Sequence, residues 1–168
     1  MIMESEPMRT GPSVKRGKSR QDYATPPDFM ESLYKRFGPI SFDLAASGEN
    51  YKHPAYFTEA EDSLSQDWSK LRGQLFLNPP FDNIAPWARK CADTSMAKVL
   101  SLGIKIFFLV PASVGSNWFA AYVHKRALVL ALNGRIHFDP TNPTWGYPKD
   151  CMLCVYGELP GFDVWRWK

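Results

Sequence analysis

The chain has 168 residues, 45% of them hydrophobic and 22% charged, which is enough for one globular domain with a full core. Its net charge of +3 permits a polyanionic partner but is too small to imply one. The apolar runs of the chain, "IFFLV" among them, are too short to span a bilayer, and the first ten residues carry acids where a secretory signal would be apolar. With an odd number of cysteines, three, these features predict a reduced cytoplasmic enzyme or binding domain rather than a membrane or secreted protein.

Residues 1–22 are predicted to form a flexible basic tail in front of a single folded domain, residues 23–168. The stretch "RTGPSVKRGKSR" carries five positive charges separated by glycine, proline and serine, a composition that does not support a packed core. Such a tail could contact nucleic-acid phosphates through residues 15–20. A solvated end is the simpler interpretation.

The first predicted element of the domain is a helix over residues 26–37. Thr25 is a candidate N-cap, and Pro26 suits the first helical position. Phe29, Leu33 and Phe37 form one apolar stripe at helical spacing. Thr-Pro-Pro is a good helix start whatever the protein does, so this pattern alone indicates structure and not function.

Three strands and a further helix are predicted in the middle of the chain. A strand over 40–44 is followed by a polar, aromatic segment, residues 46–73, which predicts an ordered loop with short helical turns and no strong strand. The next strand covers 74–77, and a helix is expected to begin near Asn83. Residues 105–110 are apolar throughout, as in a central strand that is covered on both faces.

The last third of the chain predicts one helix and three strands. The helix covers 116–127. Short strands at 128–132 and 135–138 flank an Asn-Gly turn signal, and 151–156 is the last clear strand. Strands that alternate with helices predict an open, mostly parallel α/β sheet with helices on both faces, as in Rossmann-like folds.

Cys151 and Cys154 form a C-x-x-C motif within the last predicted strand. Residues three apart in a strand point to opposite faces, so the pair is poorly placed to hold one metal ion. No second pair of cysteine or histidine residues with ligand spacing is present. We therefore interpret both as small buried hydrophobes and expect no metal site.

Candidate site residues follow three of the predicted strands. One strand ends at Asp43 and small residues, one at Asn78 and two prolines, and one at Pro111-Ala112-Ser113. Ligands of open α/β sheets bind outside the carboxyl ends of the strands, so these groups are expected to share one cleft. An aspartate that ends a strand is also common as a turn or cap residue.

The stretch "NPPF", residues 78–81, has a composition that suits methylation of an aromatic amine. The lone pair of such an amine is delocalised, and two acceptors on its two hydrogens would favour the tetrahedral geometry needed for attack. The Asn78 side-chain oxygen and the Pro79 carbonyl can be those acceptors, held in place by the rigid Pro79-Pro80 backbone. The ring of Phe81 can stack on the base. The alternative reading is a strand terminated by two prolines.

The motifs resemble those of the phage-type DNA N-6-adenine methyltransferases, often called Dam-like. "NPPF" is a form of their Asn/Asp-Pro-Pro-aromatic motif. The resemblance extends through "YATPPDFMESLYKRFG", "FDLAAS", "EN" with "YFTEAEDSLSQDW", "PWARKC", "LVPAS" with "NWF", and "GRIHF". It implies an S-adenosylmethionine-dependent methyltransferase fold with a shortened cofactor half, double-stranded DNA as substrate, and action in the cytoplasm of a bacterial host.

The resemblance also implies residue roles. The Thr25-Pro26 pair would lie against the methionine part of S-adenosylmethionine, and an acid, Asp62 or Asp67, would face its adenosine. Glu49 and Asn50 are both candidates for the ribose, while Asp62 and Asp67 could instead be solvated or cap a turn. The first cofactor motif comprises Asp43, Ala45 and Ala46, and the catalytic motif comprises Asn78, Pro79, Pro80 and Phe81.

DNA contacts are predicted from Arg135 and His137 in "NGRIHF" and from Trp145 in the following loop. Trp145 could fill the gap left by a flipped base, although a packed loop aromatic is as good an interpretation. Two alternatives remain. The chain could methylate RNA adenine or protein glutamine by the same chemistry, or it could be a catalytically inactive DNA-binding protein with the same fold. A nucleotide-binding oxidoreductase is disfavoured because no G-x-G-x-x-G follows a predicted strand.

Overall fold

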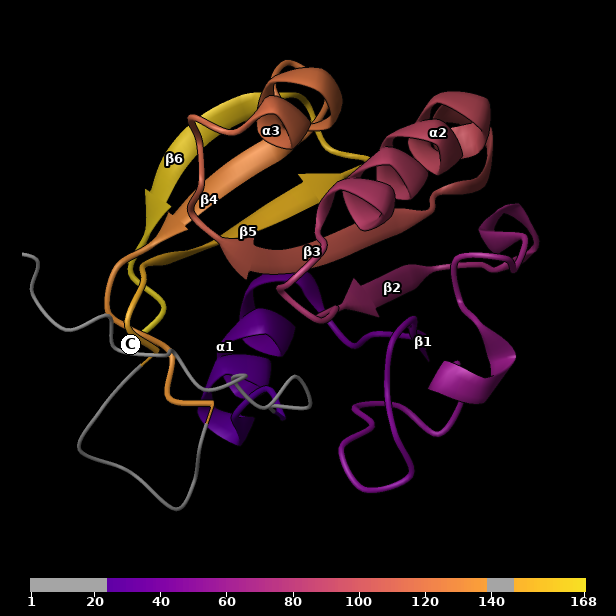
Figure 1. The fold of residues 1–168 in the computed structure, drawn as a ribbon, viewed down its shortest axis with the longest axis horizontal. Coiled ribbons are helices and arrows are strands. Elements are labelled where there is room, and N and C mark those ends of the chain that lie inside the picture. Colours follow the sequence, from indigo (N-terminus) through magenta and orange to yellow (C-terminus); the bar gives the residue numbers. More distant parts are fainter. Residues whose placement is uncertain (1–23, 139–146) are drawn as a thin grey trace, which may run out of the picture.

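The computed structural model describes residues 24–138 and 147–168, with the side chains of residues 96–102 left out. The described residues form one six-stranded sheet with helices on both faces (Figure 1). The strand order across the sheet is β1-β2-β3-β5-β4-β6. The strands are β1 (Phe42–Asp43), β2 (Gln74–Leu77), β3 (Lys105–Pro111), β4 (Leu128–Leu132), β5 (Cys151–Tyr156) and β6 (Gly161–Trp165).

All strands except β5 run in the same direction. β1, β2 and β3 pair in parallel, β5 is antiparallel to both β3 and β4, and β6 is parallel to β4. β3 lies inside the sheet, and every residue of it after Lys105 is buried, in agreement with its unbroken apolar sequence. The prediction of an open, mostly parallel α/β sheet is confirmed, consistent with a Rossmann-like fold.

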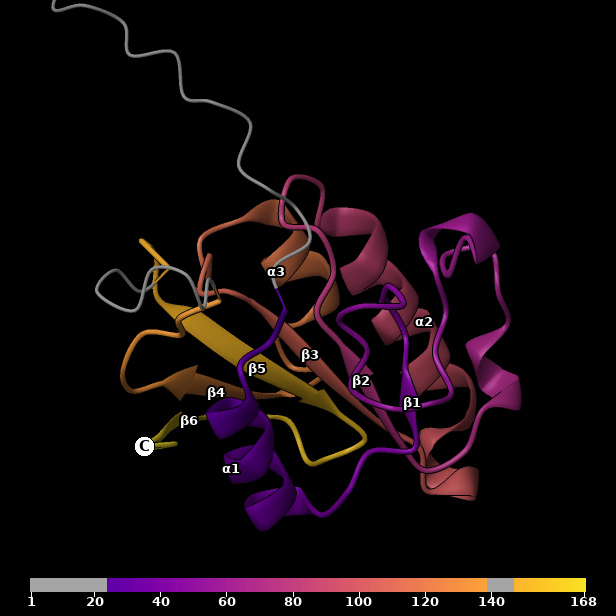
Figure 2. The same cartoon turned by 90° about the horizontal axis from the view of Figure 1, so that it is seen from below.

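The helices lie in two layers on opposite faces of the sheet (Figures 1 and 2). α1 (Pro27–Phe37) covers one face, where its stripe of Phe29, Met30 and Leu33 is fully or almost fully buried. α2 (Ala85–Leu102) and the short α3 (Asn117–Tyr122) cover the other. The segment between β1 and β2 contains two 3₁₀ turns, η1 (Glu59–Glu61) and η2 (Trp68–Lys70), and no strand, as predicted.

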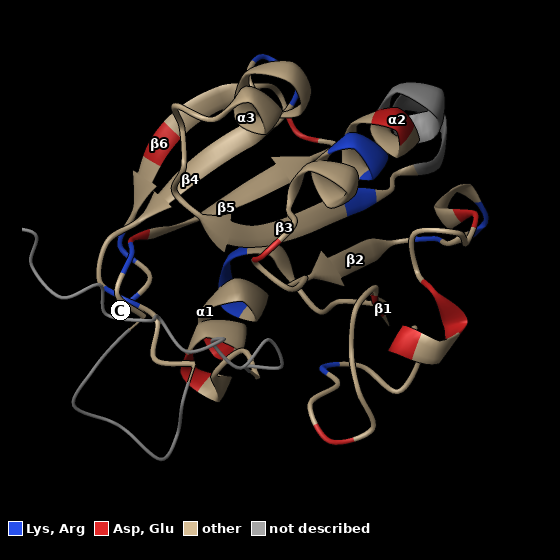
Figure 3. Ribbon diagram, viewed as in Figure 1, with Lys and Arg blue, Asp and Glu red and all other residues tan. Residues whose placement is uncertain are grey.

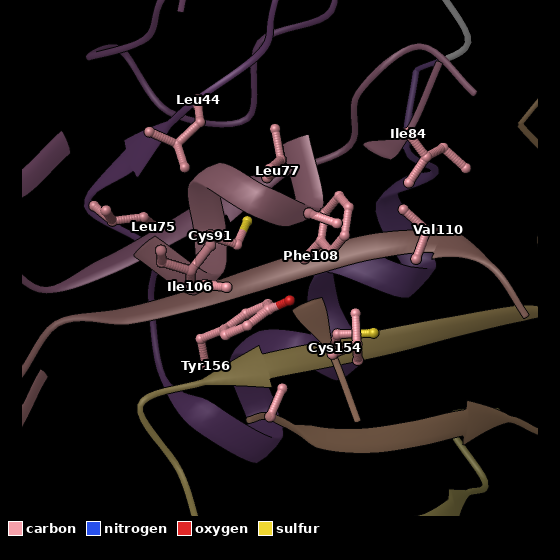
Figure 4. Close-up of a cluster of buried hydrophobic side chains, with 14 of the residues drawn as sticks. Leu44, Leu75, Leu77, Ile84, Cys91, Ile106, Phe108, Val110, Cys154 and Tyr156 are labelled. Atoms are coloured by element: carbon pink, nitrogen blue, oxygen red, sulfur yellow. The ribbon is translucent and has the colours of Figure 1, made fainter. Parts of the chain in front are cut away.

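The core on the α2 face is a continuous apolar cluster built from β2, β3, β5 and α2 (Figure 4). Within it, the buried hydroxyl of Tyr156 donates to the carbonyl of Tyr122 at 2.8 Å. Cys154 belongs to this cluster, whereas Cys151 belongs to the cluster under α1, so the two cysteines point to opposite faces as predicted. Burial raises the pKa of the Cys91 and Cys154 thiols well above the ordinary range, which makes both poor nucleophiles.

The C-terminal third differs from the prediction in three respects. Residues 135–138 form no strand, and the Asn-Gly turn is not a hairpin, because both edges of β4 are already paired, with β5 and β6. The alternating Ile136 and Phe138 are instead buried without a ladder. β6 was not predicted, since all its residues except Trp165 are exposed at the edge of the sheet. The helix predicted over 116–127 is shorter, with Ser116 as its N-cap.

Candidate functional site

A cavity of about 390 Å³ opens at the carboxyl ends of β1 and β2. Its wall is formed by Ala24 and Thr25 shortly before α1, the loop after β1, the segment around η1 and the start of the NPPF loop; Pro26 is not part of it. The predicted site residues on this wall are Thr25, Asp43, Ala45, Ala46, Asp62, Asn78 and Pro80. Because β1 and β2 are parallel neighbours, their carboxyl ends bring Asp43 and Asn78 to one place, whereas the third predicted strand end, Pro111-Ala112-Ser113, does not line this cavity.

Asp43 is the buried anion of this cavity, with only 2% of the residue exposed. Its carboxylate accepts hydrogen bonds from the backbone N–H of Lys52 at 2.9 Å and of Ala45 at 3.3 Å. Burial raises the pKa of the Asp43 carboxyl, while these two bonds and the charges of Lys52 and His53 act in the opposite direction. The Asp43 carboxylate is thus buried at the cavity and held by two backbone donors.

The backbone around Asp43 is fixed on both sides. Its carbonyl accepts from the N–H of Phe57 at 3.0 Å, and its N–H donates to the carbonyl of Ala55 at 3.0 Å. On the β2 side, the N–H of Leu44 donates to the carbonyl of Phe76 at 2.8 Å. The loop at residues 55–57 thus lies along β1 where a further strand would pair in a larger sheet.

Asn78 is bound to the segment that precedes α1. Its side-chain amide donates to the hydroxyl of Thr25 at 3.0 Å, and Thr25 is 2% exposed. The prediction that Thr25 is the N-cap of α1 is therefore wrong. The helix begins at Pro27, Pro26 is at the N-cap position, and no side chain makes a capping hydrogen bond. The hydroxyl that suggested a helix cap instead orients the amide of the NPPF motif.

Phe81 belongs to a cluster of three rings beside the cavity. Its ring meets Phe138 at a centroid distance of 5.8 Å and Tyr147 at 5.4 Å, in both cases close to edge-on. Phe138 and Tyr147 also contact each other edge-on at 5.7 Å. The backbone closes the cluster, because the N–H of Tyr147 donates to the carbonyl of Ile136 at 2.7 Å. The orientation of the Phe81 ring is thus set by two other rings.

Several other predicted residues lie off the cavity wall. Asp67 caps η2, accepting from the N–H of Ser69 at 3.0 Å, and lines a separate hollow of about 750 Å³ between η2 and α2. Asp62, in contrast, is on the cavity wall and ends η1 with a φ of 48°. Of the two ribose candidates, Asn50 lines the cavity and Glu49 does not.

The wall also contains residues that the sequence did not single out. They include Lys52, Phe57, Glu59, Ser63 and Trp87. The turn η1 is rich in acidic residues (Figure 3); Glu59 is its first residue and Asp62 is its C-cap. Lys52 follows Asp43 by nine residues, but nothing in the local sequence pattern predicts that it reaches the cavity.

The predicted DNA-contacting residues are described only in part. Arg135 is exposed and 3.9 Å from the Asp150 carboxylate, an ion pair that solvent screens. His137 is half-buried and directly precedes Phe138 of the aromatic cluster. Trp145 and the basic residues 15–20 lie outside the described residues. In the described parts of the chain, no helix is long and apolar enough to cross a membrane.

The sheet and its cavity define the class of protein: an α/β protein with a sheet consistent with a Rossmann-like fold and a cavity at the carboxyl ends of two parallel strands. Residues 13–152 match the family model of the DNA N-6-adenine-methyltransferases (Dam). The chain belongs to this family, whose members are adenine-specific DNA methyltransferases.

Two relatives agree with this membership. The Escherichia coli (strain K12) protein YfdM, named as a methyltransferase, is 32% identical over 84 residues, which are 48% of this chain and 88% of YfdM. The DNA N-6-adenine-methyltransferase of Escherichia phage T1 is 26% identical over 100 residues, which are 60% of this chain. The matched region spans 40% of the length of the phage T1 protein.

Proposed function

We propose that the chain transfers a methyl group from S-adenosylmethionine to the exocyclic N6 amine of adenine in double-stranded DNA, in the cytoplasm of a bacterial host. The observation that carries this proposal is the shared cavity of a buried carboxylate, Asp43, and an oriented amide, Asn78, at the ends of two adjacent parallel strands. Membership in the Dam family supports the reaction class.

The cavity residues suit S-adenosylmethionine, which supplies the activated methyl group when it is bound. The volume of about 390 Å³ lies in the range of small-molecule sites. Asp43 would hold the α-ammonium group of the methionine part, and the small side chains of Ala45 and Ala46 allow close approach of the ligand to the backbone. The polar groups around η1, including Asp62, would then face the adenosine.

Asn78 and Pro79 would act on the target amine. The amide nitrogen of Asn78 is engaged with Thr25, so its side-chain oxygen faces away from that hydroxyl. This oxygen and the Pro79 carbonyl would accept the two amine hydrogens and favour the tetrahedral nitrogen that attacks the methyl group. Neither acceptor has to take up a proton for transfer to occur.

Phe81 would hold the flipped base by stacking. An adenine leaves the duplex at a cost of a few kcal/mol, so the pocket must return part of the lost stacking energy. The edge-on contacts with Phe138 and Tyr147 keep the Phe81 ring in one orientation before the base arrives. Arg135 and His137, next to this cluster in sequence, would contact the DNA backbone, together with Trp145 and residues 15–20.

The test is transfer of radiolabelled methyl from S-adenosylmethionine to unmethylated duplex DNA, followed by nucleoside analysis. We expect label in N6-methyldeoxyadenosine. Label in RNA or in protein glutamine instead would support the proposed methyl transfer but refute DNA as the substrate. DNA binding without transfer or cofactor binding would identify the chain as an inactive relic of the fold.

Replacing Thr25 by valine is expected to slow methyl transfer about tenfold, because the Asn78 amide loses the acceptor that orients it. Thr25→Ser keeps the hydroxyl and is expected to retain most of the rate. The measurement is single-turnover transfer with saturating cofactor. Equal rates for the valine variant and the wild type would show that the 3.0 Å bond has no part in catalysis.

Replacing Phe81 by leucine is expected to lower kcat/KM for DNA by a factor of about 10 to 100, because base–aromatic stacking is worth roughly 1–3 kcal/mol. Affinity for S-adenosylhomocysteine should stay unchanged, since Phe81 is not on the cavity wall. Phe81→Tyr preserves the ring and serves as the control. A loss of kcat/KM in the tyrosine variant as large as in leucine would refute stacking as the role.

A further inference from the structure

Lys52 is fixed beside Asp43 at the wall of the cavity. Its backbone N–H donates to the Asp43 carboxylate at 2.9 Å, and its carbonyl accepts from the hydroxyl of Tyr34 at 3.4 Å. Lys52 is half-buried and is one of the residues that line the cavity. The backbone of Lys52 is therefore in direct contact with the buried carboxylate, and its flexible side chain starts next to it.

The ammonium group of Lys52 lacks an anionic or hydrogen-bonding partner within the described part of the chain. Two other half-buried lysines are satisfied there: Lys90 donates to the carbonyls of Leu64 and Gln66, and Lys105 pairs with Glu158. Burial lowers the pKa of Lys52, and the charge of Asp43 opposes that shift without an ion pair within 4 Å. A partly desolvated cation beside a cavity is costly unless an anion reaches it.

A ligand with adjacent opposite charges would satisfy Lys52 and Asp43 together. The α-amino acid end of S-adenosylmethionine carries an ammonium and a carboxylate on one carbon atom. On the protein, the matching anion and cation come from residues joined by the 2.9 Å backbone contact. The wall acids Glu59 and Asp62 would repel a carboxylate, and they belong to the η1 side of the cavity.

We propose that Lys52 binds the α-carboxylate of the methyl donor while Asp43 binds its α-ammonium group. This inference rests on the proposed function, because it takes S-adenosylmethionine as the ligand. It assigns recognition of the amino-acid end to a pair of residues, and predicts that nucleosides without that end gain nothing from Lys52.

The experiment is calorimetric titration of the full chain with two ligands. S-Adenosylhomocysteine has both charges of the amino-acid end, and 5′-methylthioadenosine keeps the adenosine and sulfur but has neither. Lys52→Met should weaken binding of S-adenosylhomocysteine about 10- to 100-fold and change binding of 5′-methylthioadenosine by less than about twofold. Lys52→Arg keeps the cation and should retain most of the affinity. Lys35→Met, at an exposed lysine of α1, is the matched control.

The outcomes separate this inference from the proposed function. If Lys52→Met weakens both ligands equally, Lys52 supports the fold of the loop and the inference is overturned. If it weakens neither, Lys52 does not bind the carboxylate. If the wild-type chain binds neither ligand, the proposed cofactor is wrong, and the inference fails with it. Binding by the wild type without methyl transfer to DNA would refute the proposed reaction alone.

Discussion

Replacing Asn78 by alanine is expected to lower the rate of methyl transfer by a factor of about 100 to 1,000, the usual effect of removing one oriented polar group that acts in the transition state. The reason is that the alanine variant has a single acceptor, the Pro79 carbonyl, for the two hydrogens of the target amine. Affinity for S-adenosylhomocysteine is expected to stay within about twofold, since the interaction is made with the base and not the cofactor.

The measurement is a single-turnover time course with saturating cofactor and DNA, which isolates transfer from product release. Asn83→Ala removes an exposed asparagine outside the cavity and is the matched control. Asn78→Asp keeps a side-chain oxygen but loses the N–H bond to Thr25, so its rate should fall between those of wild type and alanine. A wild-type rate in Asn78→Ala would remove Asn78 from the mechanism.

The elements that the sequence predicted well are those whose own residues carry the signal. The apolar stripe of α1 and the continuous apolar run of β3 record which faces are buried, and both elements lie where they were expected. The abrupt change from a buried strand to Asn78 and two prolines likewise located the end of β2 at the cavity. Local pattern is sufficient where one element alone decides the burial of its side chains.

The errors arose where distant partners decide the structure. Residues 135–138 alternate like a strand, but β4 has no free edge for them, because β6 from the end of the chain occupies it. Thr25 has the sequence of a helix cap, yet its hydroxyl is engaged by Asn78, 53 residues away in the chain. Asp62 and Asp67 were equivalent in sequence, and only the packing of η1 and η2 separates them.

The candidate site was predicted only in part, because some of its residues are placed by local sequence and others by distant contacts. Asp43 and Asn78 each end a strand, and the rule for parallel sheets was enough to place them together. Lys52 reaches the cavity only because the loop after β1 folds back so that its N–H bonds to Asp43. No periodicity or capping rule encodes such a return, so its contribution to the wall could not be read from the sequence.

Replacing Asp43 by asparagine is expected to weaken binding of S-adenosylhomocysteine about 10- to 100-fold, because the ligand ammonium loses a charged partner in a buried site. The change is nearly isosteric, and the oxygen of asparagine can keep the shorter bond from the N–H of Lys52. Thermal unfolding of the variant serves as the control for folding. Unchanged affinity in a folded variant would remove Asp43 from the cofactor site.

The raised pKa of Asp43 makes a second, sharper prediction about pH. In the window between the unfolded and the raised native pKa, the native state binds more protons than the unfolded state, so this group's contribution to stability falls as pH rises. Affinity for the ligand ammonium does the opposite, because only the ionised carboxylate attracts it. The charges of Lys52 and His53 act on the same carboxylate in the direction opposite to burial, so they shift the position of the window.

The two opposed trends can be isolated by difference. Unfolding free energy and S-adenosylhomocysteine affinity are measured across this acidic window for the wild type and for Asp43→Asn. Each quantity of the variant is subtracted from that of the wild type. As pH rises, the difference in unfolding free energy should fall and the difference in affinity should rise, because the asparagine cannot ionise while all other groups remain. A difference that is flat in both quantities would mean that Asp43 has an ordinary pKa and does not meet the ligand cation. A stability trend without an affinity trend would leave Asp43 as a buried acid of the fold, and the cofactor's ammonium group would require another partner.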